Sequence, residues 1–401
     1  MIPRLKPFIG LEEIAALFLP LKDAVQKFET AFAATFSTRY AVAFPYGRSA
    51  LWAFFKAMGI KGAEIVQPAY TCSVVGHATV LSGNVPVFVD NNLHDYNMDL
   101  DAFCNAITPE TRAVLPTHLF GYPMDVDSVN QIVRDAENRF GQRIYIIQDC
   151  AHSFEAEWQV KSVINAGDGA LFGLNISKQI TSIFGGMFST NDAEIVEKIK
   201  TWREGHFLEK SLLERITRAV YLPAAAIGFN DFIYGLTYWL QNNTRLLSHL
   251  TDAYHLDEKI HFPPDYLKNL AAVEARVGLE QLKKYPAIKS RRRDIAAQYF
   301  DQLRVPDSWV MPPKVEGATY SHFVIRVPNR NEVMEHAAQR GVQLGQLIEY
   351  SMPHLPSYQK YTVPDQFPNS LMCSQTTINL PIHPGLSQQK VNKVLDIFSR
   401  I

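Results

Sequence analysis

Residues 144–152 read IYIIQDCAH, and residues 167–178 read GDGALFGLNISK. The first stretch is a short apolar strand that ends on an acid, Asp149, and the second is an apolar run that leads to Lys178. Asp149 alone would fit an ordinary turn or helix cap. However, a lysine behind an apolar strand and before the glycine pair 185–186 is not typical of a surface residue. The two stretches together therefore indicate a ligand site at the carboxyl ends of parallel strands.

The same pattern extends in both directions along the chain. Short apolar strands are expected at 41–44, 64–67, 85–89, 113–116 and 144–148, alternating with helices at 21–36, 49–58, 73–81 and 126–138. Strands separated by helices imply right-handed crossovers and a mainly parallel sheet that is covered on both faces. We therefore predict an α/β fold with a large domain over residues 1–284.

A smaller α+β domain is predicted for residues 285–401. Two amphipathic helical stretches at 269–284 and 289–303 lead into it, and beyond them its signals are a strand at 322–327 and helices at 332–340 and 389–399. We find no internal repeat or low-complexity tract.

Composition narrows the class of partner. Lys and Arg number 39 against 40 Asp and Glu, so the formal charge of −1 provides no basic field for nucleic acid, and small molecules are the expected partners. The N-terminus lacks a signal-peptide pattern.

Four cysteines without a CxxC pair argue against a zinc ribbon or a disulfide framework and favour the reducing cytoplasm: Cys72, Cys104, Cys150 and Cys373. Three histidines show no HxH or HExxH spacing, so no metal site is expected: His118, His354 and His383.

Residues 219–240 are rich in Leu, Ile, Phe, Tyr and Trp, within a predicted apolar helical insert at about 207–262. Asn230 and Asp231 lie in the middle, and a charge at mid-bilayer costs roughly 2.5–3.5 kcal/mol on insertion scales. Pro223 and Gly228 also interrupt the run, so we do not expect a membrane span. We favour a buried or dimer-facing helical insert over a peripheral membrane or hydrophobic-partner surface.

A second candidate site feature is the turn 45–47, which lies between the first strand and the helix expected at 49–58. Backbone N–H groups at such a helix start can receive a phosphate.

Pyridoxal phosphate (PLP) chemistry needs a lysine amine to form a Schiff base and an acid that keeps the pyridine nitrogen protonated. Lys178 and Asp149 supply both groups.

The order of several motifs resembles the DegT/DnrJ/EryC1/StrS aminotransferase family, which consists largely of PLP-dependent sugar aminotransferases of fold type I. These motifs are GRSAL at 47–51, PAYT at 68–71, PVFVD at 86–90, DCAH at 149–152, Lys178, PHLPSY at 353–358 and LPIHP at 380–384. The resemblance covers nearly the whole chain and weakens only in the insert around residues 207–262.

The resemblance implies a role for each matching residue. Lys178 falls at the position of the Schiff-base lysine, Asp149 at that of the pyridinium partner, and His152 at that of the residue that touches the phenolic oxygen of the cofactor. Arg48 and Ser49 fall in the phosphate-binding turn.

The segment that covers a face of the cofactor ring corresponds to Tyr70-Thr71-Cys72. Members often have an aromatic residue after the threonine, so with Cys72 there, either Tyr70 stacks on the ring or that contact is missing. The motif at 353–358 leads us to expect substrate contacts from His354 and Tyr358.

Three positions depart from the family pattern. Gly173 replaces a phosphate-binding serine, for which Asn175 or Ser177 would have to compensate. The Asn-Tyr-Arg run that reaches the cofactor of the neighbouring subunit is absent before Glu274, although Asn269 lies close by. Phe184 replaces an acidic residue before the glycine pair.

The resemblance implies a cytoplasmic homodimeric enzyme that moves an amino group from an amino acid, glutamate by resemblance, to a nucleotide-linked keto-sugar. Two alternatives remain open. One is a PLP enzyme of the same fold that acts on a non-sugar carbonyl compound. The other is a non-catalytic PLP-fold binding protein that uses the apolar insert as its docking surface.

Overall fold

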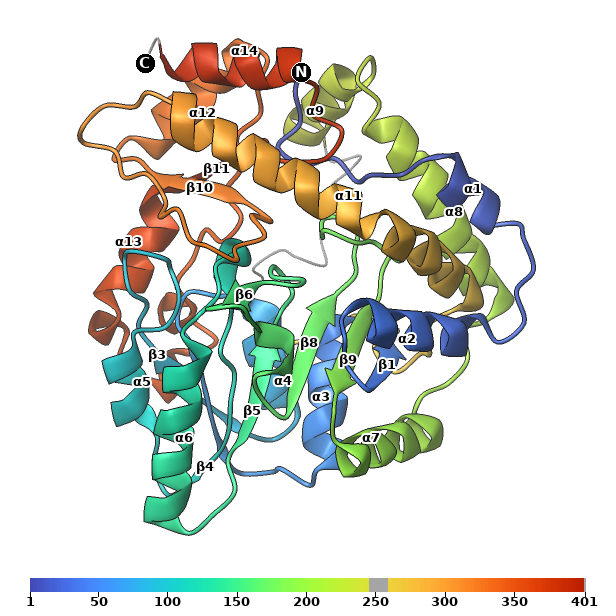
Figure 1. Cartoon of the computed structure of the whole chain (residues 1–401), viewed down its shortest axis with the longest axis vertical. Coiled ribbons are helices and arrows are strands. Elements are labelled where there is room, and N and C mark those ends of the chain that lie inside the picture. Colours follow the sequence, from blue (N-terminus) through green and yellow to red (C-terminus); the bar gives the residue numbers. More distant parts are fainter. Residues whose placement is uncertain (245–258, 400–401) are drawn as a thin grey trace.

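The computed structural model describes residues 1–244 and 259–399. A seven-stranded sheet lies at the centre of its larger part, in the order β1-β9-β8-β5-β4-β2-β3 (Figure 1). Only β9 runs against its neighbours, so the prediction of a mainly parallel sheet is confirmed. The strands are β1 (Tyr40–Phe44), β2 (Glu64–Pro68), β3 (Val85–Val89), β4 (Thr111–Val114), β5 (Tyr145–Asp149), β8 (Gly169–Gly173) and β9 (Gly186–Thr190).

Helices cover both faces of this sheet, because its strands are apolar on both sides. In β1, Ala41 and Ala43 enter one buried cluster, while Val42 and Phe44 enter another on the opposite face. On the Val42 side lie α3 (Gly47–Ala57), α4 (Ser73–Leu81) and α7 (Ala193–His206). On the other side lie α2 (Ala24–Thr35), α5 (Leu100–Ala106), α6 (Val126–Phe140) and the first half of α11 (Ala272–Gln302).

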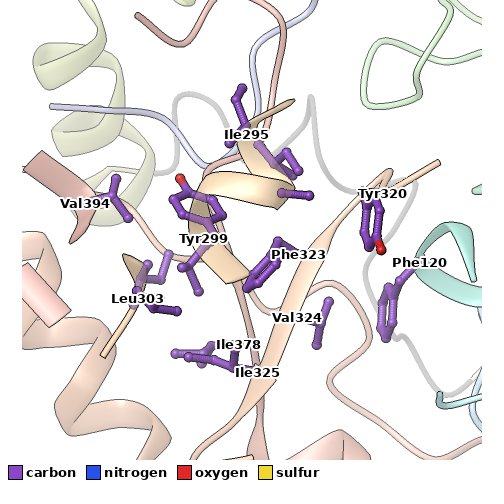
Figure 2. Packing of buried hydrophobic residues seen from close by; sticks show 14 of the residues in the cluster. Phe120, Ile295, Tyr299, Leu303, Tyr320, Phe323, Val324, Ile325, Ile378 and Val394 are labelled. Carbon is purple, nitrogen blue, oxygen red and sulfur yellow. The ribbon is translucent and has the colours of Figure 1, made fainter. Parts of the chain in front are cut away.

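The long helix α11 joins the two parts of the molecule. We expected two helical stretches here, but the structure has one 31-residue helix that continues through Pro286. Its first half packs with α2. Its second half contributes Ile295, Tyr299 and Leu303 to the core of the C-terminal part, where Tyr299 faces Phe323 (Figure 2). The domain boundary at residue 285 remains a prediction, and α11 passes across it.

A two-stranded antiparallel sheet lies within the C-terminal part. It consists of β10 (Phe323–Arg326) and β11 (Thr377–Leu380). The helices around it are α12 (Arg330–Gln339), α13 (Pro368–Thr376) and α14 (Gln388–Phe398), and a short hairpin of β6 (Glu157–Trp158) and β7 (Lys161–Ser162) follows β5.

The predicted insert contains two described helices, α8 (Leu212–Gly228) and α9 (Tyr234–Asn243), and residues 245–258 lie outside the described residues. Pro223 does not interrupt the run as expected, because α8 continues through it. The break falls after Gly228, where Asp231 forms ion pairs with Lys6 and Lys390. Within the described ranges, no helix has the length and apolarity needed to cross a bilayer.

Candidate active site

Lys178 lies in a tight turn directly after β8. Its backbone N–H donates to the carbonyl oxygen of Asn175 at 3.0 Å. The side-chain oxygen of Asn175 accepts from both the backbone N–H and the hydroxyl of Ser177, at 3.0 and 2.6 Å. Asn175 and Ser177, which we expected to compensate for the missing serine, thus bond to each other and close this turn.

The side chain of Lys178 runs directly past Gly173. A Cβ atom added at Gly173 would lie 3.2 Å from Cε of Lys178 and 4.0 Å from Cβ of Ala151. A side chain at this position would require Lys178 to shift by a few tenths of an ångström.

Asp149 occupies the carboxyl end of β5, the strand beside β8. Its carboxylate accepts the backbone N–H of Ala151 at 3.0 Å. Burial raises the pKa of Asp149, while this hydrogen bond and the charge of Lys178 oppose the rise. Burial lowers the pKa of Lys178, against the opposing effects of Cys72 and Asp149. A larger fraction of the amine is therefore neutral, and hence nucleophilic and basic, at a given pH.

His152 and His322 form a buried pair next to this lysine. Their ring centroids are 5.0 Å apart, and Phe120 stacks on His152 at 6.1 Å. Burial lowers the pKa of both histidines well below the usual value, and the charge of Lys178 adds to this effect. Since Nδ1 of His152 accepts the backbone N–H of Phe120 at 3.4 Å, Nε2 carries the proton of the neutral ring and is a donor.

No sequence motif marks His322 as a site residue, and it is predicted only as the start of a strand. It lies near enough to Lys178 to interact electrostatically, because the C-terminal part folds against the ends of the large sheet. A histidine immediately before a buried strand was the only local signal.

The first turn of α3 borders the same space. A Cβ atom at Gly47, the first residue of α3, would lie 3.0 Å from the carbonyl oxygen of Phe172 and 3.5 Å from Cα of Gly173. Arg48 is buried, with its guanidinium carbon 5.7 Å from the ring centroid of Tyr46. The hydroxyl of Ser49 donates to the carbonyl oxygen of Tyr266 at 2.8 Å. The expected phosphate turn therefore lies beside the lysine, and its helix N-terminus favours an anion.

The side chains of Tyr70 and Cys72 have different surroundings. Tyr70 is fully buried, and its hydroxyl bonds Thr377 at 2.8 Å and the carbonyl oxygen of Ile348 at 3.2 Å, both in the C-terminal part. Cys72 interacts electrostatically with Lys178. The structure thus places Cys72 nearer to the lysine and ties Tyr70 to the C-terminal part, and the two alternatives, stacking by Tyr70 or a missing contact, stay predictions.

The two expected substrate residues also differ in their surroundings. Tyr358 lies in an apolar cluster, where it stacks with His77 at 6.2 Å and its hydroxyl donates to the carbonyl oxygen of Ser73 at 3.3 Å. His354 is half-buried, and its Nδ1 has no hydrogen-bond partner among the described residues. Their roles toward substrate remain predictions.

His118 supports the strand end that carries Asp149. Its Nε2 bonds the side-chain oxygen of Gln148 at 2.9 Å, its Nδ1 accepts the backbone N–H of Met124 at 3.0 Å, and its own backbone N–H donates to the carbonyl oxygen of Asp149 at 3.2 Å. Both ring nitrogens are thus engaged in hydrogen bonds within the protein.

These residues fit PLP by the chemistry of the groups they present. Lys178 offers an amine with a lowered pKa, Asp149 offers a buried acid, and His152 offers an N–H donor. Gly173 leaves space beside the lysine, and the first turn of α3 can receive a phosphate.

Comparison with known proteins agrees with this arrangement. The model of the DegT/DnrJ/EryC1/StrS aminotransferase family matches residues 17–230 and 242–399. The chain belongs to this family. It is therefore a PLP-dependent aminotransferase.

Individual relatives match along nearly their whole length. The uncharacterized protein MJ1066 of Methanocaldococcus jannaschii is 27% identical, over 100% of this chain and 97% of its own. The spore coat polysaccharide biosynthesis protein SpsC of Bacillus subtilis is 25% identical, over 98% of this chain and 95% of its own. The structure of the sugar aminotransferase CalS13 of Micromonospora echinospora superposes with a TM-score of 0.78 over 100% of both chains at 17% identity, which shows a shared fold.

The position of Lys178 gives a direct test of the aminotransferase site. Borohydride reduction of the PLP-loaded protein should fix the cofactor to Lys178, because we expect this buried amine beside Asp149 to form the Schiff base. Lys178→Ala should lose the reducible linkage while its unfolding temperature stays near that of the wild type. Peptide mapping by mass spectrometry checks the label, and a label on another lysine would contradict the assignment.

His118 should make stability depend on pH. Burial lowers the pKa of His118 to about 4, from an ordinary value near 6.5. The stabilisation that comes from keeping this histidine neutral is complete above pH 6.5. As pH falls from 6.5 toward 4, the unfolded chain binds a proton that the folded chain does not, so the free energy of unfolding falls by about 3 kcal/mol. His118→Asn, measured by urea unfolding between pH 4 and 7, should flatten this slope. His94→Asn on the exposed surface is the control, and an unchanged slope in His118→Asn would refute the prediction.

Proposed function

We propose that the protein moves an amino group from glutamate to the carbonyl group of a nucleotide-linked keto-sugar. The observation that carries the aminotransferase chemistry is the buried amine of Lys178 at the sheet edge that also holds Asp149. Support for a sugar acceptor comes from the relatives, because SpsC is a polysaccharide biosynthesis protein and CalS13 a sugar aminotransferase.

The residues of the chain divide the work. PLP, when bound, supplies the electron sink that lets a proton leave the α-carbon of an amino acid. Nζ of Lys178 takes and returns that proton, and its lowered pKa keeps it available as a base. The carboxylate of Asp149 holds a proton on the pyridine nitrogen. His152 presents its Nε2–H donor, while its neighbour His322 and Phe120 exclude water from the same space.

An acceptor screen tests this function. Purified protein should release 2-oxoglutarate from glutamate when a nucleotide-linked keto-sugar is present, and less with free keto-sugars or simple aldehydes. Asp149→Asn should lower kcat by on the order of 10²-fold or more, because a neutral amide cannot sustain the pyridinium charge. Lys178→Ala gives the background rate. Turnover with simple aldehydes alone would instead support the non-sugar alternative.

We also propose that the active form is a homodimer. The protein exposes an apolar surface on one side, where α1 (Leu11–Ala16) and α8 join a shared buried cluster. Leu11, Phe18 and Phe232 are 84, 81 and 97% exposed on or near these helices. Further exposed apolar residues of α8 and α9 are Leu212, Leu213, Ile216, Val220, Ile227, Leu236 and Trp239. A surface of this kind is expected to be covered by a second copy.

Charge placed on this apolar surface should separate the copies. Ile216→Glu combined with Val220→Glu should yield monomers in sedimentation velocity, since a buried unpaired carboxylate opposes association. Gln131→Glu combined with Arg134→Glu, on the exposed side of α6 and away from this surface, is the control. If Ile216→Glu/Val220→Glu stays dimeric and instead loses binding to anionic lipid vesicles, the surface is a membrane contact and the dimer forms elsewhere.

A further inference from the structure

The phosphate end of the site lacks two groups that the family resemblance led us to expect. Gly173 stands where a serine was expected, and Asn175 and Ser177 bond to each other. No Asn-Tyr-Arg run precedes Glu274, and the side chain of Asn269 donates to Oε1 of Glu209 at 2.7 Å. Of the groups expected at the phosphate end, Arg48 and the first turn of α3 remain.

An arginine of the insert reaches the start of α3. Arg218, in α8, donates from Nη2 to the hydroxyl of Tyr46 at 2.9 Å, and Tyr46 is the residue that immediately precedes α3. The guanidinium carbons of Arg218 and Arg48 lie 5.8 and 5.7 Å from the centroid of the Tyr46 ring. The same group of Arg218 lies 3.9 Å from the ring centroid of Phe184. Two arginines from distant segments thus meet at one tyrosine.

Three glycines lie between Tyr46 and Lys178, and each approaches the next segment closely. A Cβ atom at Gly186 would fall 2.2 Å from the backbone nitrogen of Gly47, so the loop after Phe184 touches the first turn of α3. Gly47 in turn abuts Gly173, and Gly173 abuts Cε of Lys178. An anionic group that extends from Lys178 to the first turn of α3 would therefore lie near Tyr46, the residue that both Arg48 and Arg218 approach.

The guanidinium of Arg218 is held in one orientation, and one of its amino groups remains available for a further hydrogen bond. It pairs with Asp265, whose other oxygen accepts the Tyr46 hydroxyl at 2.7 Å, and its Nε lies 3.7 Å from Oε1 of Glu274. Its Nη1 makes no hydrogen bond to a residue of the described ranges. A fixed guanidinium with a remaining N–H pair suits a phosphate oxygen, because little entropy is lost when the bond forms.

We propose that Arg218 supplies, from its own chain, a cation of the cofactor phosphate site, together with Arg48 and the first turn of α3. The insert helix α8 thereby replaces the anion-binding groups that are missing at Gly173 and before Glu274. This inference rests on the use of PLP, and it gives the inner side of the insert a function.

Binding of PLP and of pyridoxal, which lacks the phosphate, distinguishes this role from a merely structural one. Both ligands are titrated into the full-length protein after removal of its cofactor, and the linkage to Lys178 is followed by absorbance. Arg218→Gln should raise the Kd of PLP about tenfold or more, equivalent to about 1.4 kcal/mol, and change that of pyridoxal less than about twofold. Arg218→Lys, which keeps the charge but loses the fork, should fall between wild type and Arg218→Gln.

Arg215→Gln is the matched control, because Arg215 lies exposed on the same helix and should leave both Kd values unchanged. Inorganic phosphate alone should raise the unfolding temperature of the cofactor-free wild type and not that of Arg218→Gln. An equal loss of PLP and pyridoxal binding in Arg218→Gln, or no loss of either, would overturn the inference. Failure of the wild type to bind PLP would overturn the proposed function itself.

Discussion

The burial of one amine beside one carboxyl group constrains the rest of the structure. Both charged forms are costly in a dry interior, so the protein must hold Lys178 and Asp149 close to each other and away from water. Adjacent parallel strands achieve this, since β5 and β8 end at the same sheet edge. Helices on both faces then exclude water, and the turn closed by Asn175 fixes the lysine.

The C-terminal part closes the remaining side of that edge. It brings His322 against His152, and it holds Tyr70 by hydrogen bonds to Thr377 and Ile348. Because α11 runs unbroken from the core of the large part into the core of the C-terminal part, its rigid rod fixes the position of His322 relative to Lys178. A change in the packing of α11 would therefore act on the active site without touching it.

The proximity of Asp149 and Lys178 at the sheet edge could be predicted from sequence, because each residue follows a short apolar strand and the alternation of elements places these strand ends together. His322 and Arg218 could not, since they arrive from distant segments through tertiary packing, and no local pattern marks them. Helix boundaries show the same limit. Pro223 was expected to interrupt its apolar run, and separate helical stretches were expected at 269–284 and 289–303. Instead, α8 continues through Pro223 and α11 through Pro286, because packing on neighbouring elements outweighs the loss of one backbone hydrogen bond.

Helix α8 has a buried face that carries charge and an exposed face that is apolar. Its inner face carries Arg218 into a buried network with Glu274, which also pairs with Lys210 at 3.3 Å, while its outer face exposes Ile216 and Val220. A buried network of charges needs a fixed backbone, because each ion must keep its partner. An apolar face exposed to water does not fix the backbone of the helix in this way. If two copies cover the outer face as we propose, the inner face is held still, and we expect association of the two copies and retention of the cofactor phosphate to be coupled, even though Arg218 belongs to the same chain as the cofactor.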